Sequence, residues 1–285
     1  MIVMSVVLGY HDIVKAMSFV FSAISTGGFA PVADITSIAT TFPMNAVLII
    51  SMVLGASNFF IIAGLFKRRF KEFFVSEFSV FLIMAIVSIS IAAIFFGLSA
   101  EKAVFHIVSA MTTTGFSYVS LGQFTDGFKF FLVLLMLIGG ASFSTAGGFK
   151  IVRFVLMIKA LRKAVYESVT GKEYPIKLFG REYSNANIIQ AAVTVLLFIA
   201  AAFVSAFIVS SYGFPLVDSL FETTSAVATT GLSIGIITPA LVLELKWLFV
   251  GLMIVGRVEI FAVFAMLSRN REHPISYQEK VSEKP

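Results

Sequence analysis

The stretch SAMTTTGF at residues 109–116 decides the fold of this chain, because two variants of it occur elsewhere. The variants are SAISTGGF at 22–29 and SAVATTGL at 225–232. All three open with Ser-Ala, carry Thr at the fifth position and Gly at the seventh, and end in an apolar residue. We refer to them in chain order as the first, second and third strings. Self-similarity of this kind predicts that one structural unit is used three times.

Each string ends a moderately apolar stretch of roughly 13 residues, which is too short to cross a bilayer as a helix. The stretches are 12–24, 100–112 and 215–227. Each begins near an acidic residue, namely Asp12, Glu101 or Asp218. Acidic side chains suit the first turn of a helix, where they meet the positive end of its dipole. We therefore predict three re-entrant half-helices, each followed by irregular backbone that lines a cavity inside the protein.

The composition indicates a membrane protein. The chain has 285 residues, of which 58% are hydrophobic and 13% charged, and 32 are Phe. Soluble domains are about half apolar and a quarter charged, so lipid must cover part of this surface. Five segments are long enough to span a bilayer, whereas the apolar stretch 1–9 is too short. The five segments are 45–66, 78–97, 130–158, 188–210 and 246–267.

The charges and the residue types that are missing exclude other classes. Lys and Arg gather at 67–71, 150–181 and 269–284, beside apolar runs, which predicts that these segments are cytoplasmic and argues against nucleic-acid binding despite the net charge of +5. The chain lacks Cys, which excludes disulfides and thiol metal sites. Its three His residues are not spaced as zinc ligands.

The composition of the strings favours a site for a monovalent cation. Unwound Thr/Gly backbone at the end of a half-helix exposes carbonyl oxygens, which can replace the water shell of such an ion. Gly permits the backbone angles that this requires, and the helix end carries partial negative charge. The strings hold no carboxylate, which disfavours a divalent ion. The alternative is that small residues only allow close helix packing. The candidate ion-binding residues are Ser25, Thr26, Gly27, Gly28, Thr113, Thr114, Gly115, Phe116, Thr229, Thr230, Gly231 and Leu232.

Two further features complete the pattern. The stretch GGASFSTAGGFK at 139–150 interrupts the third span, where Gly, Ser and Thr would bend or break a helix. We call residues 139–149 the glycine loop. Arg257 lies near the middle of the last span, where a charge is costly unless it faces a cavity or a partner. Glu259 is a poor partner because residues two apart do not share a helix face. Glu222 is predicted to brace its half-helix or to bias the pore toward cations.

With these motifs, residues 12 to 270 resemble the Trk/Ktr/HKT superfamily of potassium transporters, especially its TrkH-type pore subunits. The resemblance implies an all-α membrane protein with membrane–pore-loop–membrane repeats around a central pore. Three of the family's four repeats are expected here. Residues 1–70 match the second, 71–182 the third with the basic cytoplasmic segment, and 183–285 the fourth with a cytoplasmic tail.

The resemblance also implies a function and a gate. The expected function is potassium uptake across the cytoplasmic membrane, with K⁺ as the transported ion, no cofactor and no catalysis. Gly28, Gly115 and Gly231 favour potassium, since a Ser at this family position favours sodium; a sodium or non-selective transporter is the alternative. The glycine loop and Arg257 are assigned to a gate below the filter, and simple helix packing or an ion pair are the alternatives. The gate residues are Gly139, Gly140, Gly147, Gly148, Lys150 and Arg257.

Partners follow from the resemblance as well. It implies a homodimer with one pore per protomer and a cytoplasmic nucleotide-binding subunit of the TrkA/KtrA type, which would meet the basic segment 159–181. Because a fourfold pore needs four strings, the sequence also suggests that the chain is part of a longer protein and that Met1 is not the native start. A separate polypeptide supplying the fourth wall is the alternative.

A hydrolase is the remote alternative. GLSIG at 231–235 matches the G-x-S-x-G pattern, with Ser233 as the nucleophile. This chemistry needs a base within hydrogen-bond reach, and the candidates are His11, His106 and His273. None is accompanied by a clear orienting carboxylate, and His106 is more simply an interior histidine whose ring nitrogens are hydrogen-bonded.

Overall fold

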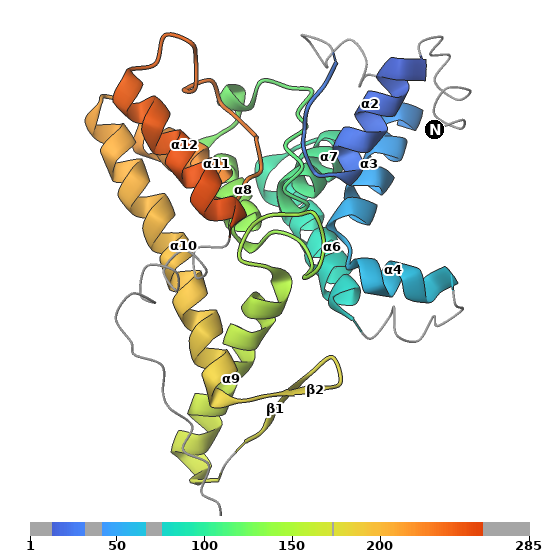
Figure 1. Ribbon diagram of the computed structural model, residues 1–285, viewed down its shortest axis with the longest axis vertical. Coiled ribbons are helices and arrows are strands. Elements are labelled where there is room, and N and C mark those ends of the chain that lie inside the picture. Colours follow the sequence, from blue (N-terminus) through green and yellow to red (C-terminus); the bar gives the residue numbers. More distant parts are fainter. Residues whose placement is uncertain (1–12, 32–41, 67–75, 173, 259–285) are drawn as a thin grey trace, which may run out of the picture.

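A computed structural model describes residues 13–31, 42–66, 76–172 and 174–258, and within this part the chain is mostly helical (Figure 1). Several predicted features lie outside the described residues: the stretch 1–9, His11, Asp12, the cluster 67–71, Glu259, His273 and the basic tail 269–284. The helices are α2 (Ile13–Ile24), α3 (Phe42–Ala56), α4 (Phe59–Phe66), α6 (Glu77–Phe96), α7 (Ala100–Met111), α8 (Asp126–Ile138), α9 (Ile151–Thr170), α10 (Asn185–Ser211), α11 (Leu216–Val227) and α12 (Leu243–Arg257), with a 3₁₀ turn η2 at Leu121–Gln123. The strands are β1 (Ile176–Leu178) and β2 (Arg181–Tyr183).

The three short helices α2, α7 and α11 confirm the predicted half-helices, with ends within a residue or two of those expected. Each packs against the helix next to it in sequence, as α2 does on α3 and α11 on α12. Two of them also pack across a repeat: α7 lies on α3, and α11 lies on α8. The half-helices are therefore held in the bundle, where α7 and α11 are buried along most of their length after an exposed or half-buried first turn.

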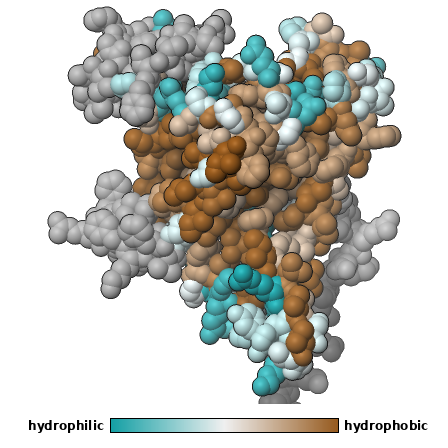
Figure 2. Space-filling model, turned by 180° about the vertical axis from the view of Figure 1, so that it is seen from behind, coloured by the Kyte–Doolittle hydropathy of each residue, from teal (hydrophilic) through white to brown (hydrophobic). Residues whose placement is uncertain are grey.

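Within the described part of the chain, two helices, α6 and α10, are long and apolar enough to cross a membrane. They correspond to the predicted spans 78–97 and 188–210. Their apolar side chains face outward, as with Ile94, Phe95 and Phe207, each more than 70% exposed. Figure 2 shows the result as a hydrophobic belt between two more polar ends. Such a belt is the surface that lipid, rather than water, would cover.

The prediction of one continuous span at 45–66 is wrong, because the chain breaks at Ser57 and Asn58 into α3 and α4. The Asn58 side chain accepts a hydrogen bond from the N–H of Phe60 at 2.9 Å, which caps the new helix. The N–H of Phe59 donates to the carbonyl of Phe143 in the glycine loop at 3.2 Å. In Figure 1, α4 turns away from the direction of α3 and points outward at the side of the bundle.

The third predicted span, 130–158, is divided as expected by the glycine loop into α8 and α9. Helix α9 continues to Thr170, so much of the basic segment is helical. A two-stranded hairpin follows, and the sequence did not predict it. Its turn places Phe179 and Gly180 at φ 49° and 75°, as a type I′ turn requires. Helix α9 and the hairpin project from one end of the bundle (Figure 1).

Candidate functional site

The three half-helices end in the same backbone motif. In each, the N–H of the sixth string residue bonds the carbonyl of the first, and the N–H of the fifth bonds that of the second. The bonds from the sixth residue to the first run from Gly27 to Ser22 at 2.8 Å, from Thr114 to Ser109 at 3.0 Å and from Thr230 to Ser225 at 2.8 Å. This is the Schellman helix end, which requires a left-handed residue just after the helix. Thr26, Thr113 and Thr229 take that role, with φ of 51°, 51° and 52°.

A left-handed Thr is unusual, because its branched side chain crowds the backbone. A residue in this region costs on the order of 1–3 kcal/mol, and such strain gathers at functional sites. Gly28, Gly115 and Gly231 follow two residues later with φ of 69°, 87° and 89°. Each string therefore has a left-handed Thr at its fifth position and a left-handed Gly at its seventh, with nearly the same φ values. The three backbones turn in the same way.

In two of the repeats, the hydroxyl of the Ser that opens the string makes a hydrogen bond to the backbone of the same string. The hydroxyl of Ser109 donates to the carbonyl of Phe116 at 2.7 Å, and that of Ser225 accepts from the N–H of Gly231 at 3.1 Å. Each bond ties the half-helix to the far end of its own string. The hydroxyl oxygen of Ser22 is buried and has no hydrogen-bond partner among the described residues.

The strings lie side by side and meet at their glycines. A Cβ placed on Gly28 would lie 2.1 Å from the carbonyl oxygen of Thr114, and one on Gly115 would lie 2.1 Å from that of Thr230. A side chain at either position would therefore collide with the neighbouring string. A Cβ on Gly231 would meet no described atom within 4 Å. Instead, a cavity of about 660 Å³ opens between the first and third strings, with Arg257 in its wall.

The glycine loop lies against the ends of the half-helices. The N–H of Gly147 donates to the Thr113 hydroxyl at 2.6 Å, and the Thr145 hydroxyl reaches the carbonyls of Ile24 at 2.9 Å and Gly55 at 3.0 Å. A Cβ on Gly147 would lie 1.9 Å from the carbonyl oxygen of Ala228. The loop thus contacts all three strings, and a side chain at Gly147 would collide with the third.

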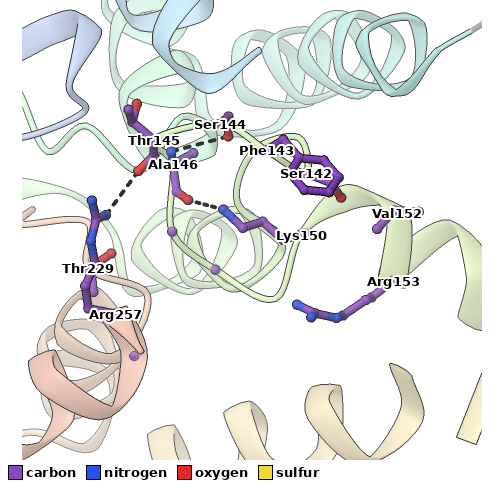
Figure 3. Close-up of a pocket in the computed structure, with 13 residues that line it drawn as sticks. Ser142, Phe143, Ser144, Thr145, Ala146, Lys150, Val152, Arg153, Thr229 and Arg257 are labelled. Atoms are coloured by element: carbon purple, nitrogen blue, oxygen red, sulfur yellow. Dashed lines mark hydrogen bonds between the residues drawn. The ribbon is translucent and has the colours of Figure 1, made fainter. Parts of the chain in front are cut away.

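Arg257 reaches the glycine loop from α12. Its Nη1 donates to the Thr145 carbonyl at 3.1 Å (Figure 3). The preceding residue explains the approach, since a Cβ on Gly256 would lie 1.9 Å from the carbonyl oxygen of Val227, the last residue of α11. Similarly, a Cβ on Gly55 would lie 2.2 Å from the carbonyl oxygen of Ile24, the last residue of α2. Gly256 thereby brings Arg257 beneath the end of the third half-helix.

A second cavity, of about 450 Å³, lies between the glycine loop, α9 and the end of α12 (Figure 3). Lys150, Arg153 and Arg257 line it, and its described lining contains no acidic residue. The Lys150 ammonium group donates to the Ala146 carbonyl, which folds its charge back over the loop. The cavity on this side of the strings therefore combines positive charge with the glycine loop.

Among the described residues, Ser233 is bonded to a carboxylate and not to a histidine base. Its hydroxyl donates to Glu222 Oε1 at 2.6 Å. The described histidine, His106, contacts the Lys102 carbonyl at 2.8 Å and the Ser117 hydroxyl at 3.2 Å, and so serves another loop. The interpretation of His106 as a hydrogen-bonded interior residue is confirmed.

Three polar residues that hold the site were not singled out from the sequence. Glu77 Oε2 accepts from the Ser142 N–H of the glycine loop at 2.5 Å. Lys129 Nζ lies 2.7 Å from Asp218 Oδ1 and joins α8 to α11. Asn45 donates to Glu101 Oε1 at 2.7 Å and joins α3 to α7. A buried Lys or Glu within an apolar run was the available signal, but its partner lies far away in the sequence.

The geometry agrees with comparison to known proteins. The family model described as TrkH, cation transport protein, matches residues 70–278. The chain belongs to the TrkH family. This family consists of transport proteins and not of enzymes, in agreement with the expectation for this chain. The potassium transporter TrkH from Vibrio parahaemolyticus has the same fold, with a TM-score of 0.79 and 20% identity over 93% of this chain and 62% of that structure.

Curated relatives span the same family. An uncharacterized cation transporter of Methanocaldococcus jannaschii is 29% identical over 255 residues, which is 89% of this chain and 53% of the relative. Ktr system potassium uptake protein B of Bacillus subtilis is 27% identical over 90% of this chain and 60% of its own length. Trk system potassium uptake protein TrkH of Halomonas elongata is 24% identical over 89% and 55%. The chain therefore spans little more than half the length of these relatives.

Proposed function

We propose that this chain forms three of the filter-bearing walls of a pore that conducts monovalent cations, with preference for potassium, across the cytoplasmic membrane. The observation that carries the proposal is the shared backbone geometry of the three strings, each with a left-handed Thr and a left-handed Gly two residues later. Carbonyl-lined backbone of this kind replaces the hydration shell of a monovalent ion. The expected filter residues are therefore the fourth to seventh of the first string and the fifth to eighth of the others.

The proposed units follow the repeats, with residues 1–70, 71–182 and 183–285 each containing one string. The glycine loop and Arg257 form the proposed gate, because Arg257 donates a hydrogen bond to the Thr145 carbonyl of the loop and the cavity beside them is lined by cationic side chains. The basic segment, α9 and the hairpin are placed on the cytoplasmic side by the positive-inside rule. A homodimer and a nucleotide-binding regulatory subunit on that side are the proposed partners; two relatives are named as subunits of Ktr and Trk uptake systems.

Growth rescue tests this proposal. The full-length gene that contains this chain is expressed in a bacterium that lacks potassium uptake, and growth is measured at low potassium with sodium in excess. Rescue is expected. The alternative, a sodium or non-selective transporter, predicts cation flux without rescue when sodium competes. Correct membrane insertion with no monovalent cation flux would refute the proposal.

A further inference from the structure

Two buried side chains occupy equivalent positions before the second and third strings. Glu222 lies three residues before Ser225, and His106 lies three residues before Ser109. Their partners are equivalent as well, since Ser233 and Ser117 each lie eight residues after the Ser that opens the string. Each pair joins the middle of a half-helix to the loop just after its string.

The Glu222 pair is the stronger of the two. Besides the Ser233 hydroxyl at 2.6 Å, Glu222 Oε1 accepts three consecutive backbone N–H groups at 2.9, 3.1 and 3.2 Å, from residues 234–236. Convergence of donors on one carboxylate oxygen makes strong bonds that fix a loop in position. The residue is 1% exposed, and these bonds begin only two residues beyond Gly231.

Burial of a carboxylate needs a compensating benefit. Glu222 Oε2 is buried and has no hydrogen-bond partner among the described residues. A buried polar atom left in this way is costly, and an apolar residue at this site would avoid the cost. The first repeat has apolar residues in place of the polar pair. Its equivalent positions are Phe19 and Ala30, which lie in one hydrophobic cluster. Packing alone can therefore support a string, so the polar pairs are expected to contribute more than stability.

We propose that Glu222 and His106 are positioning residues that set the cation selectivity of the filter by holding the loops after the third and second strings. The proposal rests on the function proposed above. The bonds fix where each string ends, and thus how far its carbonyls can move toward a smaller ion. With the Glu222 bonds removed, the string relaxes around ions of different radius, and discrimination between potassium and sodium falls.

Matched variants of the full-length protein test this inference. Glu222→Leu removes all four bonds, Glu222→Gln keeps an oxygen acceptor but removes the charge, and Ser233→Ala removes one bond. His106→Phe introduces the residue of the first repeat. Glu244→Gln is the control, since it makes the same charge change at an exposed carboxylate at the start of α12. The measurements are the ratio of potassium to sodium flux in proteoliposomes, and the shift in melting temperature of the detergent-solubilised protein with each salt.

The ratio is expected to fall about tenfold or more in Glu222→Leu, which corresponds to about 1.4 kcal/mol, because this variant removes all four bonds with which Glu222 holds the loop after the third string. Smaller falls are expected in Glu222→Gln, Ser233→Ala and His106→Phe, with the control unchanged. Selective stabilisation by potassium is expected to fall in the same order. If Glu222→Leu does not insert into the membrane, the flux ratios of Glu222→Gln, Ser233→Ala and His106→Phe test the inference instead.

Folded variants with the wild-type ratio and the wild-type salt response would overturn the inference while leaving the proposed function intact. A wild-type protein that neither transports nor binds a monovalent cation would overturn both. The wild-type measurement thus separates failure of the function from failure of the positioning role.

Discussion

Replacement of Arg257 with Ala is expected to increase cation flux through the pore. The variant removes the guanidinium from both cavities that it lines and breaks its hydrogen bond to the Thr145 carbonyl. If the cavity of about 450 Å³ were a sphere, an ion at its centre would lie about 5 Å from the wall. Two unit charges at about 5 Å repel by roughly 3 kcal/mol at an effective dielectric constant of about 20.

That value is an upper bound for this residue, because Arg257 is exposed and water screens its charge. A barrier of about 1–2 kcal/mol remains as a working magnitude, which corresponds to roughly 5- to 30-fold in rate. Loss of the Thr145 bond acts in the same direction, since it frees the glycine loop from α12. The expected result for Arg257→Ala is therefore a flux increase within this range.

The assay is the initial rate of rubidium or potassium uptake into proteoliposomes at equal protein content. Arg257→Lys is the control, because it keeps the charge and loses the planar guanidinium. It is expected to remain within a few-fold of the wild type. Equal flux in the wild type and Arg257→Ala, or equal increases in the Ala and Lys variants, would refute the electrostatic part of the reasoning.

Three further predictions concern packing and the filter. Gly256→Ala places a methyl group 1.9 Å from the Val227 carbonyl and is expected to lower the free energy of unfolding by about 1–3 kcal/mol, whereas Gly251→Ala, with nothing within 4 Å, is expected to be neutral or stabilising in a thermal melt. Gly115→Ser clashes with the Thr230 carbonyl and is expected to weaken discrimination against sodium; an unchanged flux ratio would contradict this. Lys129→Met leaves Asp218 without its 2.7 Å partner and is expected to cost roughly 3 kcal/mol of stability, with Lys129→Met/Asp218→Asn recovering part of it; destabilisation that the double variant does not reduce would count against the ion pair.

The half-helices could be predicted because the same string occurs three times in the chain, each time at the end of a short apolar stretch. A single stretch of 13 apolar residues is ambiguous, but three that end in the same Thr/Gly string are not. The interruption at 139–149 was visible for the same reason, since Gly and Ser/Thr are conspicuous in an apolar span. Close approaches explain Gly28 and Gly115 at the seventh position, and the left-handed φ of 89° explains Gly231.

Other features depended on contacts between distant residues. The break at Asn58 was missed because 45–66 is almost uniformly apolar, and its causes are one short cap and a bond from the glycine loop. The bonds from Glu77 to Ser142 and from Lys129 to Asp218 join positions 65 and 89 residues apart, which no local pattern encodes. Glu222 was noticed as a brace, but its donors lie after the string and in irregular backbone.

The most direct test of the central claim is a competition flux measurement on the full-length protein in proteoliposomes. Uptake of labelled rubidium is followed while unlabelled potassium or sodium is added at equal concentrations. The proposed carbonyl-lined filter predicts strong inhibition by potassium and weak inhibition by sodium. Equal inhibition by both ions, or no rubidium uptake by correctly inserted protein, would contradict the assignment of these strings as a potassium filter.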